Sequence, residues 1–297
     1  MNEKFILYLG GGAMAGVFSA GVVTKFQELD IYDKIEAVYG ASAGALNAAY
    51  FLTKQTKFGL DIYAVEMPKN LIRFKNTFKA ILQRFQYTHG ERFSRKKISN
   101  VLDIRYIFEE VIKNRKRLDF DYLKSQRIPF YVKVLNLSSF EIENLDIDSH
   151  DPVKLLKAAV DIAPYTFDTE RIGKFNYIDG ALKELIGLNY LLKKYPHRKI
   201  VLVLNFPIKR GVNFYIKDFF EGLFSIPMYG KNLYKCYLNR ESGIRKDINL
   251  AINNDRVLLI YPVDGKSLNP ASTDKDKILE SFAYGREQGM KIIDFLK

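Results

Sequence analysis

The stretch that decides the fold is Ile35-Glu36-Ala37-Val38-Tyr39-Gly40-Ala41-Ser42-Ala43-Gly44-Ala45-Leu46-Asn47-Ala48-Ala49. An apolar segment precedes Ser42 and a run of small residues follows it, which predicts a strand, a sharp turn and a helix. A serine on such a turn projects its hydroxyl outward, where the helix N-terminus also points its amides. Gly40 and Gly44 lack the Cβ atoms that would clash in so tight a bend. The pattern favours a nucleophilic serine over an accidental turn.

The bulk composition is that of a globular protein with a large buried core. The chain has 297 residues, of which 47% are hydrophobic and 27% are charged. Its 46 Lys and Arg residues outnumber its 34 Asp and Glu residues, so the formal net charge is +12. This excess favours an anionic partner, such as a phospholipid surface, nucleic acid or an acidic substrate. Charge alone does not choose among these three.

Cysteine usage and the lengths of the apolar runs predict a cytoplasmic protein, with peripheral contact to a membrane left open. Cys236 is the lone cysteine, so an intrachain disulfide is excluded, and its Tyr- and Leu-rich surroundings predict a buried structural thiol. The apolar run Phe5–Leu9 is too short for the core of a signal peptide. No run approaches the roughly 20 apolar residues of a membrane-spanning helix. No Cys/His cluster resembles a metal site.

The order of apolar runs predicts an α/β fold with a mainly parallel central sheet. The first fifty or so residues follow the sequence strand, glycine loop, helix, strand, turn, helix, which opens a doubly wound sheet. The predicted strands are Phe5–Leu9, Ile35–Tyr39, Ile128–Leu137, Phe140–Ile147, Ile200–Asn205 and Arg256–Tyr261, and the predicted helices include Val17–Leu29, Asp151–Ile162 and Lys275–Leu296. Without linkers or repeats, a single domain over residues 1–297 with a helical insertion at roughly 55–126 is the economical prediction.

A serine hydroxyl needs a base, and the sequence offers an aspartate more readily than a histidine. The histidines, His89, His150 and His197, lie in patterns typical of surface loops. Asp179, in Tyr177-Ile178-Asp179-Gly180-Ala181, follows a short apolar pair and precedes a glycine, so it is predicted to end a strand. An ordinary turn aspartate is the competing interpretation. The lack of a suitable histidine makes Asp179 the preferred base.

The third element is the loop Gly10-Gly11-Gly12-Ala13-Met14-Ala15-Gly16. Backbone amides on a glycine-rich loop that runs into a helix can stabilise the oxyanion of a tetrahedral intermediate. A dinucleotide fingerprint starting at Gly10 and Gly12 would require glycine at Ala15, and no G-K-[ST] motif is present. A nucleotide cofactor is therefore not expected.

These three motifs, in this order, resemble the patatin-like phospholipases of the bacterial type, which are acyl hydrolases with a Ser–Asp dyad. The segments Ile128–Val132 and Ala163-Pro164, and the approach Lys174–Asp179, are also similar to that family, so the resemblance spans essentially the whole chain. It implies a three-layer α/β/α sandwich, with no cofactor or metal. It implies that Ser42 is the catalytic nucleophile and Asp179 the general base. It also implies that the amides of Gly11, Gly12 and Ala13 form the oxyanion hole. The remaining motif positions that it implies are Gly10, Gly16, Gly40, Gly44, Gly180 and Ala181.

The sequence departs from the family pattern in the glycine loop. When the loop is aligned on Gly16, Ala13 replaces the third glycine and Ala15 replaces a basic residue. When it is aligned instead on Gly10 to Gly12, the loop is one residue longer than the family pattern. Ala181 stands where glycine is commoner in the aspartate motif. These changes keep open a catalytically degenerate protein that binds lipid or membrane without hydrolysis.

The resemblance implies hydrolysis of lipid carboxyl esters, in a phospholipid or lysophospholipid, through an acyl-enzyme. A soluble short-chain carboxylesterase or thioesterase is the alternative enzyme. Nucleic acid is not expected as a partner, and the sequence does not indicate an oligomeric state.

Two segments are candidates for contact with an anionic membrane. Residues 69–97 combine nine basic side chains with a row of apolar residues at helical spacing, and Glu91 is their lone acid. The aromatic-rich segment Phe214–Tyr229 suits a lid or the wall of an acyl-chain pocket. Packing of either segment on the core is the competing interpretation.

Overall fold

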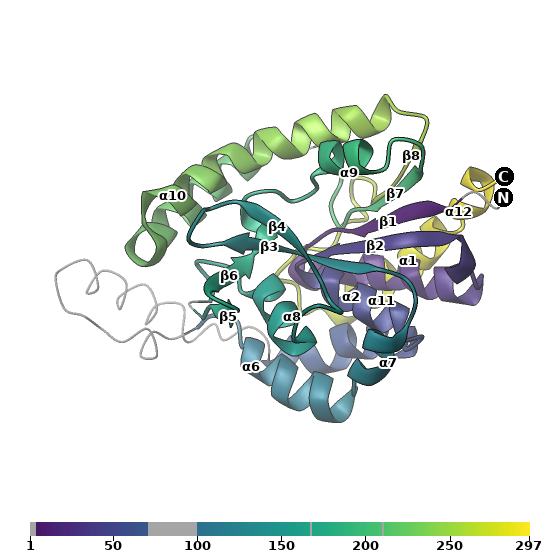
Figure 1. Ribbon diagram of the computed structural model, residues 1–297, viewed down its shortest axis with the longest axis horizontal. Coiled ribbons are helices and arrows are strands. Elements are labelled where there is room, and N and C mark those ends of the chain that lie inside the picture. The colour runs from purple at the N-terminus through teal and green to yellow at the C-terminus, as the bar shows by residue number, and fades with distance from the viewer. Residues whose placement is uncertain (1–3, 71–99, 167, 210) are drawn as a thin grey trace.

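A mainly parallel sheet forms the middle of the molecule (Figure 1). The computed structural model describes residues 4–70, 100–166, 168–209 and 211–297. Within these residues, eight strands form one sheet in the order β5-β6-β3-β2-β1-β7-β8, with β4 also paired to β3. The strands are β1 (Phe5–Leu9), β2 (Ile35–Ala41), β3 (Phe130–Asn136), β4 (Ile142–Asp146), β5 (Glu170–Ile172), β6 (Phe175–Asp179), β7 (Lys199–Val203) and β8 (Val257–Ile260).

Helices cover both faces of this sheet, which confirms the predicted three-layer α/β/α fold (Figure 1). One face is covered by α1 (Val17–Glu28), α2 (Ala43–Leu52), α8 (Pro152–Val160) and α11 (Lys275–Gly289), and the other by α9 (Leu188–Lys194) and α10 (Asn213–Ile252). The shorter helices are α3 (Gly59–Asp61), α4 (Met67–Asn70), α6 (Ile104–Tyr106), α7 (Phe120–Ser125) and α12 (Ile292–Phe295). In the part of the chain that the structure describes, none of these helices is both long and apolar enough to cross a bilayer.

The strand directions place several loops at one edge of the sheet. Neighbours in the series β3-β2-β1-β7-β8 run parallel, whereas β4 and β6 run antiparallel to β3. The strands β1, β2 and β7 therefore end at the same edge, which is where ligands bind in open α/β sheets. The glycine loop, Ser42 and the segment that leads into α10 all begin at this edge.

The predicted elements agree with the structure where the sequence pattern is local. The strand Phe5–Leu9 has the predicted bounds, and the predicted hairpin pairing of residues 128–137 with residues 140–147 is present as β3 and β4. The prediction of one helix over Lys275–Leu296 is wrong, because a turn at Met290 and Lys291 separates α11 from α12. Strand β5 was not predicted from the sequence, since its three residues carry no alternating pattern.

Two predictions concern residues that the structure does not describe. Of the basic stretch 69–97, residues 71–97 lie outside the described residues, and so does His89.

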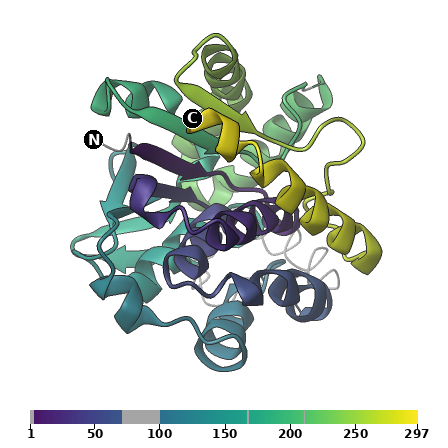
Figure 2. The same ribbon diagram turned by 90° about the vertical axis from the view of Figure 1, so that its right-hand side faces the viewer.

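Two glycines allow α1 and α11 to pack backbone against backbone. A Cβ at Gly21 of α1 would lie 2.2 Å from the carbonyl oxygen of Phe282, and a Cβ at Gly285 of α11 would lie 2.1 Å from that of Phe18. Figure 2 shows the yellow C-terminal helices lying beside purple α1. The two helices therefore depend on the absence of side chains at these crossing points.

We expect Gly21→Ala to lower the free energy of unfolding by about 1–3 kcal/mol, because the helices must separate to accommodate the new methyl group. Gly243→Ala on α10 is the matched control. A Cβ there meets nothing within 4 Å, so the higher helix propensity of alanine should raise stability by about 0.5–1 kcal/mol. Urea denaturation of both variants measures the difference. Equal stability of Gly21→Ala and the unmodified protein would contradict this packing.

Candidate active site

Ser42 occupies the sharp turn between β2 and α2 that the sequence predicts. Its backbone has a positive φ of 53° with ψ at −134°, a strained conformation for a residue with a side chain. The amide of Ala45 donates to the Ser42 carbonyl at 2.9 Å, which closes the first turn of α2. A Cβ on Gly40 would lie 2.6 Å from the Cα of Ala45. The bend is therefore so tight that a side chain at Gly40 would clash, as the sequence predicts.

The glycine loop after β1 lies directly against this turn. A Cβ at Gly11 would lie 2.6 Å from the Cβ of Ser42 and 3.3 Å from its Oγ. A Cβ at Gly44 would lie 2.2 Å from the carbonyl oxygen of Leu9. The backbone of the loop thus contacts the serine, and a side chain at either glycine would separate them.

The amides of Gly11, Gly12 and Ala13 belong to the loop that lies against Ser42, and Gly11 is the residue whose contact with the serine is closest. In the described residues, none of these amides donates a hydrogen bond to a protein group. Ala13 adopts a left-handed φ of 48°, which costs a non-glycine residue about 1–2 kcal/mol. An alanine at this position of the glycine loop is therefore accommodated as local strain. Ala15, the other alanine that departs from the expected loop pattern, is buried in the core.

Two asparagines that the sequence analysis missed hold the glycine loop in place. Nδ2 of Asn205, directly after β7, donates to the carbonyl oxygens of Gly10 at 2.7 Å and Gly11 at 3.2 Å. Nδ2 of Asn47, on α2, donates to the carbonyl oxygen of Gly16 at 2.8 Å. With their carbonyls bound in this way, these loop residues cannot turn freely. The available signal was, for Asn205, an asparagine at the end of an otherwise apolar run and, for Asn47, a polar residue within a run of small apolar ones.

Strand register brings Asp179 to Ser42. Ala41, at the end of β2, pairs with Lys133 of β3, and the next residue of β3, Val134, pairs with Asp179 of β6. Ser42 and Asp179 therefore lie on opposite sides of β3 at the same level. Their backbones are separated by two strand spacings of about 4.8 Å each, so the two side chains can meet above β3.

The Asp179 carboxyl is fully buried. Its Oδ1 accepts from the amide of Ala181 at 2.8 Å, and its own amide donates to the carbonyl oxygen of Asp161 at 2.9 Å. Burial raises the pKa of Asp179 to about 7, while the Ser42 hydroxyl, the Ala181 amide and two cations act in the opposite direction. The carboxyl thus titrates near neutrality.

Lys133, the first of these cations, is a buried side chain that the sequence analysis missed. Its Nζ donates to Oε1 of Glu184 at 2.8 Å and to the carbonyl oxygen of Ile186 at 2.6 Å. A Cβ at Gly180 would lie 2.7 Å from Cγ of Lys133, so the glycine after Asp179 rests on this lysine. A lysine inside the apolar run of β3 was the signal that could have identified it.

Arg240 of α10 is the second cation that lowers the pKa of Asp179. It forms an ion pair with Asp218, and its guanidinium also donates to Oε2 of Glu221 at 3.1 Å. Oε1 of Glu221 in turn accepts from the hydroxyl of Tyr165 at 2.6 Å. No local pattern in the sequence relates residue 240 to Asp179, because the contact arises only when α10 folds onto the sheet.

Of the other residues that the sequence singles out, the glycines support the turns around Ser42, whereas the described histidines and the cysteine lie elsewhere. The Gly10 amide donates to the carbonyl oxygen of Val203 at 2.9 Å, and a Cβ at Gly16 would lie 2.4 Å from the hydroxyl of Tyr63. His150 binds the Asp146 carbonyl through Nδ1 at 2.8 Å, and His197 is exposed. Cys236 is buried on α10, as predicted.

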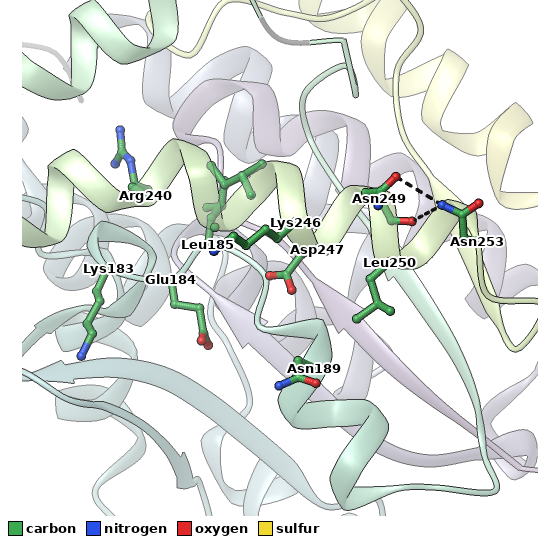
Figure 3. Close-up of a pocket in the computed structure, with 12 residues that line it drawn as sticks. Lys183, Glu184, Leu185, Asn189, Arg240, Lys246, Asp247, Asn249, Leu250 and Asn253 are labelled. Atoms are coloured by element: carbon green, nitrogen blue, oxygen red, sulfur yellow. Dashed lines mark hydrogen bonds between the residues drawn. The ribbon is translucent and has the colours of Figure 1, made fainter.

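A hollow of about 630 Å³ lies beside the site, between α10 and the segment that follows Asp179 (Figure 3). Its lining includes Arg240, Glu184 and Asp247, but neither Ser42 nor Asp179. Asp247 accepts from the amide of Gly187 at 2.8 Å. The hollow therefore belongs to the contact between α10 and the segment of residues 183–189, and is separate from Ser42 and Asp179.

Comparisons with known proteins identify the family and the fold. A family model described as "Patatin-like phospholipase" matches residues 7–192. Among solved structures, the crystal structure of VipD from Legionella pneumophila matches with a TM-score of 0.51 and 15% identity, over 99% of this chain and 67% of that chain. At this identity the likeness shows the fold alone. A comparison with curated proteins gives no match.

The raised pKa of Asp179 predicts how stability depends on pH. Between 3.8 and about 7, the unfolded chain has released a proton that the folded carboxyl retains. The free energy of unfolding should therefore fall, relative to that of Asp179→Asn, by up to about 1.4 kcal/mol per pH unit as pH rises through this range. Urea titrations of both proteins across the range measure it. Asp161, whose pKa burial also raises, is present in both and largely cancels. Parallel stability curves would contradict the assignment.

Proposed function

The chain belongs to the patatin-like phospholipase family, and we propose that it hydrolyses the carboxyl esters of lipids through a Ser42–Asp179 dyad. The observation that carries the proposal is the register across β3. It brings a strained serine on one side of β3 and a buried carboxyl on the other to the same level of the sheet. Family membership indicates lipid acyl hydrolase activity. The site residues, the dyad and the lipid ester specificity are our assignment.

In the first step, Ser42 attacks the ester carbonyl carbon while its proton passes to Asp179. A general base works best when its pKa lies near the working pH. Burial brings the pKa of Asp179 to about 7, well above the usual value for an aspartate. Oδ1 is held by the Ala181 amide, and Oδ2 is buried without a hydrogen bond of its own in the described residues. Oδ2 is therefore the oxygen that we assign to receive the proton.

The glycine loop stabilises the tetrahedral intermediate. Negative charge develops on the former carbonyl oxygen, and the amides of Gly11, Gly12 and Ala13 are the donors that we assign to it. They make no protein hydrogen bond in the described residues, so they need not break one to bind the oxyanion. The asparagines that hold the loop carbonyls keep these donors in place before substrate arrives.

The intermediate collapses to an acyl-enzyme, and the alcohol leaves with the proton that Asp179 had accepted. Water then attacks the Ser42 ester, again with Asp179 as base, and a second tetrahedral intermediate releases the fatty acid and regenerates the serine. Lys133 and Arg240 contribute electrostatically. Without their positive charge the pKa of the buried Asp179 would be higher, and less of the carboxyl would be ionised at neutral pH.

We expect a fluorophosphonate probe to label the protein covalently and Ser42→Ala to abolish the labelling. Ester turnover by this variant should fall at least about a thousandfold, because no other group replaces the nucleophile. Ser149→Ala, at an exposed loop position, is the matched control and should be labelled normally. In-gel fluorescence and a chain-length series of esters measure both effects.

An unmodified protein that resists the probe would contradict the proposal and favour a lipid-binding protein without hydrolytic activity. A preference for the shortest acyl chains would instead favour the carboxylesterase or thioesterase alternative.

A further inference from the structure

The first half of α10 exposes a continuous row of large apolar side chains. We define the α10 apolar face as the large apolar side chains that are 39–72% exposed between residues 212 and 223. They are Val212, which caps the helix, and Tyr215, Ile216, Phe219, Phe220 and Leu223. Their spacing of three and four residues places them on one side of the helix. A row of this kind on the surface of a protein marks an interaction site more often than an isolated exposed side chain does.

The opposite side of the same helix is buried although it is polar. Asp218, Glu221 and Ser225 are 3%, 6% and 0% exposed. The chain reverses at Gly230, where φ is 74°, so that the second half of α10 brings Arg240 against Asp218 and Glu221. Burying three charged groups costs desolvation energy. The arrangement fixes the helix with its acids inward and its rings outward, the reverse of ordinary core packing.

The exposed charge on α10 is entirely positive. All residues of this helix are described, and its four acids are Asp218, Glu221 and Glu241, which are buried, and Asp247, which is partly buried and binds the Gly187 amide. Its exposed charged side chains are Lys217, Lys231, Lys235, Arg245 and Lys246. An apolar row on the first half of α10, with exposed cations on both halves, suits an anionic lipid surface, which accepts rings below its headgroups and attracts cations above them.

The α10 apolar face begins at the edge of the sheet that carries the site. Strand β7 runs parallel to β1 and ends at Val203, and α10 begins at Asn213. Asn205, in the connecting segment, is the residue whose side chain binds the carbonyls of Gly10 and Gly11. The segment that holds the glycine loop therefore leads directly into the exposed row.

We propose that the α10 apolar face docks on the surface of an anionic phospholipid bilayer. The inference rests on the proposed function in that docking would bring the edge carrying Ser42 to the layer that contains lipid esters. It replaces the interpretation of Phe214–Tyr229 as packed core, because five large apolar side chains of this segment, between residues 215 and 223, are exposed.

Cosedimentation with phosphatidylglycerol vesicles tests the proposal. We expect the Ser42→Ala protein to bind these vesicles, with weaker binding to phosphatidylcholine vesicles and at high salt. Phe219→Ser/Phe220→Ser should reduce binding at least about tenfold, since each ring contributes apolar area to insertion. Leu279→Ser on α11 is the matched control, at a side chain that is 39% exposed, and should bind normally. Substitution of Lys217, Lys231 and Lys235 by Gln should remove the preference for the anionic lipid.

Unchanged binding by the double phenylalanine variant, or absence of binding by the unmodified protein, would overturn the proposal. If a second copy of the chain covers this face, sedimentation velocity should show a dimer, and the double phenylalanine variant should be a monomer. That result would also overturn the proposal. Hydrolysis of a soluble p-nitrophenyl ester separates this test from the proposed function. The double variant should retain that activity, whereas Ser42→Ala should lose it and still bind vesicles.

Discussion

The contact between the glycine loop and the serine turn is the constraint on which the rest of the site depends. Gly11 and Gly44 let the backbone after β1 approach Ser42 more closely than any side chain would allow. The carbonyls on this loop are held by Asn205, and the far end of the loop is held by Asn47. Strain at Ser42 and Ala13, where φ is positive, is maintained by this packing. Positions that tolerate such strain are typical of functional sites.

The second constraint is electrostatic. A fully buried carboxyl at Asp179 would remain protonated at neutral pH if burial acted alone. The Ser42 hydroxyl and the Ala181 amide oppose burial, and so do the positive charges of Arg240 and Lys133. The resulting pKa of about 7 suits the proposed general base, which must both accept and return a proton. Arg240 reaches this position as part of the same buried cluster that turns the α10 apolar face outward. The positive charge that lowers the pKa of Asp179 and the orientation of the exposed rings therefore have one structural cause.

Local features of the site could be predicted from the sequence, and features that depend on tertiary contact could not. The strand, turn and helix around Ser42 follow from the spacing of apolar residues and glycines, and so does the strand that ends at Asp179. Lys133 carries a visible signal, because a charged residue within the apolar run of β3 is unusual. Arg240 gave none, since residues 61 positions apart in sequence meet only through the packing of α10 on the sheet.

The aromatic segment of α10 shows why composition misleads about burial. Its density of Phe and Tyr left open both a lid or pocket wall and packed core, and the structure shows Asp218 and Glu221 on the inward side of the helix with several of the rings outside. The spacing of these two acids, three residues apart on one helix face, was the available sign.

The most direct test of the account compares two buried aspartates in hydrolysis of a lysophospholipid. Asp179 and Asp161 are both buried with a raised pKa, and only Asp179 is placed at Ser42 by the register across β3. The account predicts that Asp179→Asn lowers kcat/KM by at least about a hundredfold. Asp161→Asn should stay within about tenfold of the unmodified protein, because its backbone carbonyl still binds the Asp179 amide. Unmodified turnover by Asp179→Asn, or an equal loss in both variants, would contradict the Ser42–Asp179 dyad.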